Sequence, residues 1–174
     1  MEPQRAPSIV KIATKYGLIQ GVLSFVTFLV TTLAGIKPTW AGSVVNVALL
    51  VVLMALAHRE FKRIHEGAMT YPQGLGSGTL LALVAAVLSG VLVYVYVKFI
   101  DTGYFAVAMQ VQRAALQQRG ISGAQAEQAM ALTSAFMTPA GLVVASLISG
   151  VIVGFIVALI VSIFTQKADP RAVI

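Results

Sequence analysis

The stretch that decides the fold is residues 139–165, PAGLVVASLISGVIVGFIVALIVSIFT, which contains no charged residue. A helix needs about 20 largely apolar residues to cross a bilayer. Thr138 and Pro139 suit the start of such a helix, because the hydroxyl can cap it and a first-turn proline needs no N–H partner. This stretch alone therefore predicts a membrane-spanning helix.

Three further stretches have the same character, so the predicted membrane helices cover residues 9–34, 41–57, 75–99 and 139–165. The chain is 58% hydrophobic and 10% charged, whereas soluble domains carry about 25% charged residues. Much of the surface must therefore face lipid. Ser8 can cap the first helix. The short connection 35–39 predicts an antiparallel hairpin of the first two helices, with Trp40 at the interface. We expect one membrane domain, 1–174, with an all-α fold: an integral membrane four-helix bundle.

The connection at residues 102–138 is predicted to be an extramembrane helical hairpin between the third and fourth helices. Apolar residues recur at helical spacing from Tyr104 to Ala115, opposite a polar stripe. Gly120 ends this helix, and the sequence from Ser122 to Gln125 resembles a capping box that begins a second helix. We expect the second helix to end near Met137. The hairpin would lie on the membrane or over the bundle.

The distribution of positive charge predicts the orientation. Of the 12 Lys and Arg residues, eight fall on the side of the N-terminus and four on the other side. Cytoplasmic segments carry the excess of positive charge, so both termini are predicted to be cytoplasmic in a bacterial inner membrane. The first apolar stretch, from Tyr16 to Gly35, is longer than the core of a signal peptide. We therefore interpret it as a membrane helix that is retained.

No catalytic apparatus is recognisable in the sequence. The chain has no cysteine, so thiolate chemistry and cysteine metal sites are excluded. The six Asp and Glu residues all lie outside the predicted spans, and intramembrane charges usually mark ion paths and proton relays. This absence argues against an ion-coupled transporter and against intramembrane proteolysis. We expect no catalytic residue, no cofactor and no metal.

Two weaker patterns have simple structural explanations. His58 and His65 lie near Glu60 and Glu66, but neighbouring cations would repel a metal ion and the spacing of a zinc motif is missing. The glycine-rich segment at Gly74 lacks the Lys of a phosphate-binding loop. With no clustered basic face, nucleic acid is not an expected partner. The basic residues near the spans are instead predicted to contact lipid headgroups: Lys11, Lys15, Arg59, Lys62 and Arg63.

Small residues form the most specific pattern. They recur every fourth position on the third and fourth predicted helices, and Gly17 and Gly21 make a shorter version on the first. Such stripes let helix backbones approach closely in lipid. The sequence leaves open whether they meet within one chain or between chains. The predicted packing residues are Gly74, Gly78, Ala82, Ala86 and Gly90, and Ser146, Gly150, Gly154, Ala158 and Ser162.

Two polar side chains, Gln20 and Asn46, lie within the predicted spans. Counted from the ends of the apolar runs, their depths differ by about 9 Å at 1.5 Å per residue, so we do not expect them to pair. The simplest role is a hydrogen bond to a neighbouring helix. A functional intramembrane polar site is the alternative.

Four short motifs stand out: KYGLIQG at 15–21, Tyr71-x-Gln73-Gly74-Leu75-x-x-Gly78, Tyr94-Val95-Tyr96 and Phe136-Met137-Thr138-Pro139. Together they resemble the DUF4199 family of proteins of unknown function, over about residues 15–167. The resemblance implies a four-helix membrane fold in the envelope of bacteria, mainly of the Bacteroidetes type, and it implies no activity. Two departures are fewer acidic residues between the third and fourth helices than expected, and Asp101 where a proline is expected.

The favoured function is that of a small, non-catalytic structural or accessory membrane subunit, which packs against itself or a larger complex. The alternative is a homo-oligomeric channel or transporter for an uncharged small solute, lined by Gln20, Asn46 and the hydroxyl groups of the first helix. An enzyme acting on lipid ranks third, because no charged constellation supports it. Membrane lipid is the partner expected in every case.

Overall fold

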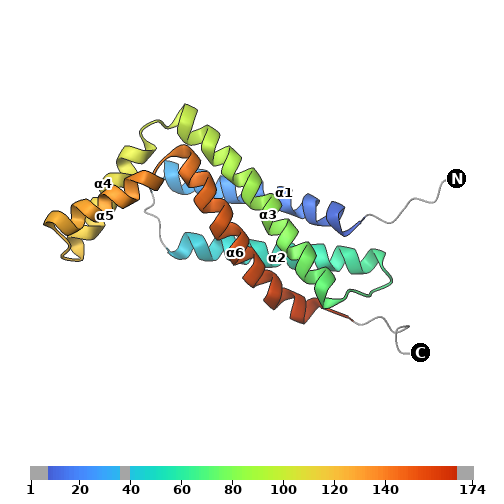
Figure 1. Ribbon diagram of the computed structural model, residues 1–174. Coiled ribbons are helices and arrows are strands. Elements are labelled where there is room, and N and C mark those ends of the chain that lie inside the picture. The colour runs from blue at the N-terminus through green and yellow to red at the C-terminus, as the bar shows by residue number, and fades with distance from the viewer. Residues whose placement is uncertain (1–7, 36–39, 168–174) are drawn as a thin grey trace. The chain divides into compact units, whose positions relative to one another are not determined.

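The computed structural model describes residues 8–35 and 40–167 of the chain (Figure 1). This part of the chain is helical, apart from turns and one isolated antiparallel bridge between Met69 and Lys167. The all-α fold class is therefore confirmed. The helices in chain order are α1 (Ile9–Leu33), α2 (Trp40–Ile64), α3 (Tyr71–Val95), the π-helical segment η1 (Tyr96–Ile100), α4 (Tyr104–Gln118), α5 (Gly123–Phe136) and α6 (Pro139–Thr165).

Four of these helices are long and apolar enough to cross a membrane: Ile9–Leu33, Gly42–Ile64, Tyr71–Ile100 and Pro139–Thr165. The predicted first and fourth membrane helices agree with α1 and α6 almost to the residue. Their capping was also predicted correctly. Ser8 Oγ accepts a hydrogen bond from the Lys11 amide at 3.4 Å, and Thr138 Oγ1 accepts one from the Gly141 amide at 3.0 Å.

The second membrane helix was predicted to end too early, and the third was predicted to begin too late. Helix α2 continues past Ala57 to Ile64, because charged side chains at a membrane surface do not end a helix. Helix α3 begins at Tyr71 rather than near Leu75. A capping contact that the sequence analysis missed sets this start: the Thr70 amide donates to Gln73 Oε1 at 2.9 Å, which is the Gln half of a capping box.

The chain forms two compact units, and the boundaries between them fall within α3 and α6. The second unit, Gly90–Ser146, contains α4 and α5, which lie side by side as a helical hairpin (Figure 1). The predicted hairpin is thus confirmed, and Gly120, with a φ of +74°, ends its first helix. The capping box was wrong in one respect. Ser122 is the N-cap residue of α5, but its side chain makes no capping hydrogen bond.

The first unit contains α1, α2, the beginning of α3 and the end of α6, and here the two small-residue stripes face each other. A Cβ atom placed on Gly78 would lie 2.8 Å from Cβ of Ala158, and one on Gly150 would lie 3.0 Å from Cβ of Ala86. Residue numbers rise along one stripe as they fall along the other, so the helices are antiparallel. The four pairs in this unit are Gly74 with Ser162, Gly78 with Ala158, Ala82 with Gly154, and Ala86 with Gly150.

The second unit contains the fifth pair of the predicted stripes, Gly90 with Ser146, where a Cβ on the glycine would lie 3.3 Å from the serine Oγ. The question left open by the sequence is therefore answered: the stripes meet within one chain. Helix α1 uses its two glycines in the same way. Cβ atoms on Gly17 and Gly21 would lie 2.8 Å and 3.0 Å from the carbonyl oxygens of Leu81 and Ala85 in α3.

The core of the first unit lies where the beginning of α1, the end of α2 and the facing parts of α3 and α6 pack together. Ala13, Met54, Leu81 and Ala158 are completely buried there. By contrast, none of residues 22–35 and 42–49 is buried. The hairpin of α1 and α2 is therefore packed at one end and open at the other.

Candidate functional site

Several polar residues of the first unit gather at the packed end, around His58. This histidine is 1% exposed. Its Nδ1 lies 2.7 Å from Thr165 Oγ1 at the end of α6, and its Nε2 lies 3.1 Å from the carbonyl oxygen of Gly74 in α3. A carbonyl can only accept a hydrogen bond, so Nε2 donates. One imidazole ring thereby joins three helices, and burial is tolerated because both nitrogens are bonded.

Neighbouring hydroxyl and ammonium groups complete this network. The Gly74 carbonyl also accepts from Ser77 Oγ at 2.9 Å, and Lys62 Nζ donates to the carbonyl oxygen of Thr165 at 3.0 Å. Thr165 Oγ1 also lies 2.8 Å from the carbonyl oxygen of Val161, so its single hydrogen is donated either to this oxygen or to His58 Nδ1. The last turn of α6 is thus held against α2 by its side chain and by its otherwise unpaired carbonyl.

The chain turns sharply after α2, and this turn shapes the surface beside His58. The amide of Gly67 donates to the carbonyl of Lys62 at 2.7 Å, which is the closing bond of a Schellman motif. Glu66 and Gly67 both have positive φ, of 51° and 86°. A glutamate in this conformation is unusual, because the left-handed region normally favours glycine. Met69 then pairs with Lys167 through two backbone hydrogen bonds of 3.0 and 2.9 Å.

A pocket of about 460 Å³ opens between the end of α2 and the segment that follows α6. We call it the basic pocket, because four cations and one carboxylate line it. Three of the predicted headgroup-binding residues lie here, whereas Lys11 and Lys15 do not line it. Lys167 was missed by sequence analysis because only the Met69 bridge brings it beside α2. The lining residues are Arg59, Lys62, Arg63, Glu66, Gly67 and Lys167.

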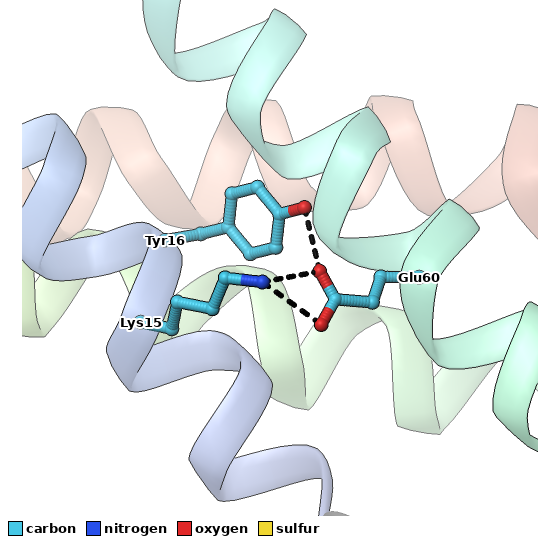
Figure 2. A network of polar contacts seen from close by, with 3 residues as sticks. All are labelled: Lys15, Tyr16 and Glu60. Carbon is cyan, nitrogen blue, oxygen red and sulfur yellow. Dashed lines mark hydrogen bonds and ion pairs between the residues drawn. The ribbon is translucent and has the colours of Figure 1, made fainter.

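Lys15 instead forms an ion pair with Glu60, between α1 and α2 (Figure 2). Its Nζ lies 2.7 and 3.0 Å from the two carboxylate oxygens, and the Tyr16 hydroxyl donates to Glu60 Oε2 at 2.7 Å. Lys15 is 55% exposed and Glu60 is 21% exposed. Since exposed pairs stabilise little, this contact mainly fixes which face of α2 turns toward α1.

Gln20 and Asn46 lie closer together than predicted. Gln20 Nε2 donates to Ser24 Oγ at 3.2 Å and to the backbone carbonyl of Asn46 at 3.4 Å. The predicted difference in depth is wrong because the depth of Asn46 was counted from Ala57, whereas α2 extends to Ile64. The end of the apolar run in α2 therefore does not lie at the same level as the end of the apolar run in α1. The predicted interhelical hydrogen bond of Gln20 is confirmed. Within the described part of the chain, Gln20 Oε1 and Asn46 Oδ1 are buried without a partner.

The histidines and acids of this region have structural roles. The ring of His65 stacks on Phe61 with a centroid separation of 4.0 Å, and its Nδ1 lies 3.0 Å from the Phe61 carbonyl. His58 is occupied by Thr165 and Gly74. Among residues 8–35 and 40–167, no three His, Cys, Asp or Glu side chains form a group that could hold a metal ion.

The fold and the polar end of the bundle define an α-helical membrane protein. Residues 15–167 match the family described as "Protein of unknown function (DUF4199)", and the chain therefore belongs to this family. The predicted resemblance is thus confirmed over nearly the whole chain. No curated protein and no solved structure matches the chain.

Proposed function

We propose that this protein is a non-catalytic accessory subunit that packs against another membrane helix through the second half of α1. The exposure of α1 carries this proposal. Only 17% of the most apolar 18-residue stretch of α1 is buried, compared with 39% of the corresponding stretch in the span that begins with α3. Val22, Val26 and Val30 are 47%, 45% and 56% exposed and recur every fourth residue. They form a continuous face that the described part of the chain leaves uncovered.

The side chains of this face suit helix packing. Valine is restricted to one main rotamer in a helix, so it loses little side-chain entropy when a second helix packs on it. The hydroxyls of Thr27 and Thr31 donate within α1, to the carbonyls of Leu23 and Thr27, both at 2.9 Å. The surface therefore offers apolar contacts without unpaired hydroxyl groups. The partner would be a second copy or a subunit of a larger complex.

The absence of catalysis is part of the proposal. Two groups that could serve as acid or base at the packed end are engaged in structural contacts: His58 with Thr165, and Glu60 with Lys15 and Tyr16. These contacts support a scaffolding role for the polar end.

Disulfide cross-linking in native membranes tests the accessory role. The chain has no cysteine, so a single Val26→Cys substitution gives an unambiguous reporter. We expect it to cross-link to a second copy or to one defined protein. Val87→Cys is the matched control, because Val87 on α3 is 46% exposed. Equal behaviour of the two variants would mean that the valine face simply meets lipid.

A second function, a homo-oligomeric channel or transporter for an uncharged solute, is favoured by one observation. Gln20 Oε1 and Asn46 Oδ1 are both buried acceptors without a partner, and such groups are costly in a membrane unless satisfied. A neutral solute with N–H or O–H groups could bind them. Solute flux into proteoliposomes, lost in a Gln20→Leu variant, would establish this function and displace the accessory role.

We also propose that the protein lies in the inner membrane of a bacterium, with both termini in the cytoplasm. The eight-to-four distribution of the 12 Lys and Arg residues supports this orientation. The basic pocket would then face the cytoplasm.

A further inference from the structure

We propose that the basic pocket binds the phosphate group of an acidic phospholipid, as a specific headgroup site. This inference is independent of the accessory role, because it rests on other residues. Arg59, Lys62 and Arg63 come from the last turns of α2, and Lys167 follows the end of α6.

The charges in the pocket call for an anion. Positions 59, 62 and 63 share one helical face, where like charges repel each other. Lys167 adds a fourth cation, and Glu66 is the single acid among the lining residues. Glu60 cannot fully neutralise these cations, since Lys15 and Tyr16 already donate hydrogen bonds to its carboxylate. A phosphate would relieve the repulsion and could accept paired hydrogen bonds from an arginine.

The pocket is also held in shape before any ligand binds. Lys62 Nζ is fixed by its 3.0 Å bond to the Thr165 carbonyl, which leaves two of its three N–H groups free of that bond. The backbone at Lys167 is fixed by the bridge to Met69, which is 1% exposed. The Schellman turn at Glu66 and Gly67 closes another side. Such preorganisation lowers the entropy lost on binding.

Position in the membrane favours a lipid over a free phosphate ion. The candidate spans of α2 and α6 end at Ile64 and Thr165, so the pocket lies at the level where headgroups lie. Phe164, immediately before Thr165, is 82% exposed and Ile163 is 55% exposed. Exposed apolar side chains in the last turn of α6, a few residues before Lys167 in the chain, suit a ligand with a charged head and acyl chains. The occupant that fits both features is an anionic phospholipid such as phosphatidylglycerol.

The test measures ligand binding to the purified full-length protein in a neutral detergent. Short-chain phosphatidylglycerol, short-chain phosphatidylcholine and inorganic phosphate are each titrated, and binding is followed by the shift in melting temperature and by native mass spectrometry. The variants are Arg59→Gln with Arg63→Gln, and Lys167→Gln alone. Arg113→Gln is the matched control, because Arg113 is an exposed cation of α4 outside the pocket.

We expect saturable binding of phosphatidylglycerol and little binding of phosphatidylcholine. Each pocket cation removed should weaken binding about five-fold, the effect of one cation at an anionic surface, whereas Arg113→Gln should change it less than two-fold. Size-exclusion profiles should remain unchanged, since these side chains are exposed. Equal losses in Arg113→Gln and the pocket variants would overturn the proposal in favour of diffuse surface charge. Binding of inorganic phosphate without phosphatidylglycerol would overturn the lipid assignment.

Discussion

Replacing Gly154 by alanine should separate α3 from α6, because this glycine is at the closest approach of the two stripes. An added Cβ would fall on the methyl group of Ala82, much nearer than two carbon atoms can lie. At Gly150, one turn away on the same stripe, an added Cβ would lie 3.0 Å from Cβ of Ala86. The same chemical change is therefore severe at one position and mild at the other.

The size of each effect follows from these contacts. Carbon atoms pack best at about 3.5–4.0 Å, so Gly150→Ala, with its contact of 3.0 Å, needs a shift of about half an ångström to reach the near end of this range. A gain in helix propensity of at most about 1 kcal/mol offsets this strain, and the net change should be within about 0.5 kcal/mol of zero. Gly154→Ala must move the helices apart. Burial of the added methyl group does not offset this loss of contacts, because lipid tails are as apolar as the helix interface. We expect it to destabilise the fold by about 2–3 kcal/mol, near the upper range for overpacking.

The assay is unfolding in mixed detergent micelles, followed by circular dichroism, with size-exclusion chromatography to record the oligomeric state. Adding Ala82→Gly to Gly154→Ala moves the methyl group from one helix to the other and should recover most of the loss, as a coupled pair does. Ile156→Leu, at a position that is 50% exposed, is the control. Equal stability of the two glycine variants, or no rescue by Ala82→Gly, would refute this packing. Loss of an oligomer with an intact monomer would show that the stripe acts between subunits.

Single cysteines at Lys37 and Gln117 should react with a membrane-impermeant reagent added outside cells, and one at Lys62 should not; the reverse pattern would overturn the orientation. Elemental analysis of the purified protein should find no stoichiometric transition metal, and a one-to-one zinc signal that disappears in His58→Ala would contradict this. His58→Ala should nevertheless lower the melting temperature, because it removes the buried link between three helices; an unchanged melting temperature would contradict the structural role of the ring. Glu60→Gln should lower it less than Gly154→Ala does, since its ion pair is largely exposed; a larger loss would show that the pair contributes more than its exposure suggests.

Local sequence signals predicted most of the secondary structure and failed at particular residues. Ser8, Thr138 and Gly120 marked helix ends correctly, because capping depends on the few residues around the end. The end of α2 was missed because a Schellman turn, with Glu66 in a conformation that usually indicates glycine, ended the helix later than the apolar run. The start of α3 could have been found, since Thr70 and Gln73 have the spacing of a capping box. At Ser122 the spacing of a capping box is present, but the Ser122 side chain forms no capping hydrogen bond.

The candidate site was only partly predictable. The cations of α2 could be assigned to a membrane surface because they follow an apolar span. Nothing in the sequence near Lys167 or Thr165 indicated that these residues meet Lys62 and His58. Their contacts join positions about a hundred residues apart in the chain, and such pairs are set by how helices pack. The same reason explains why Gln20 reaches Asn46.

By itself, the sequence determined that the chain is a helical membrane protein of the DUF4199 family, because hydrophobic length and capping residues act locally. It also identified the small residues on which α3 and α6 pack, since a four-residue period places them on one helix face. Only the tertiary structure decided that the two stripes meet within one chain, with Gly78 against Ala158 and Gly154 against Ala82. It also decided that Lys167 joins Arg59 and Arg63 around one pocket. These outcomes depend on the register between helices, which side-chain packing sets across long separations in sequence.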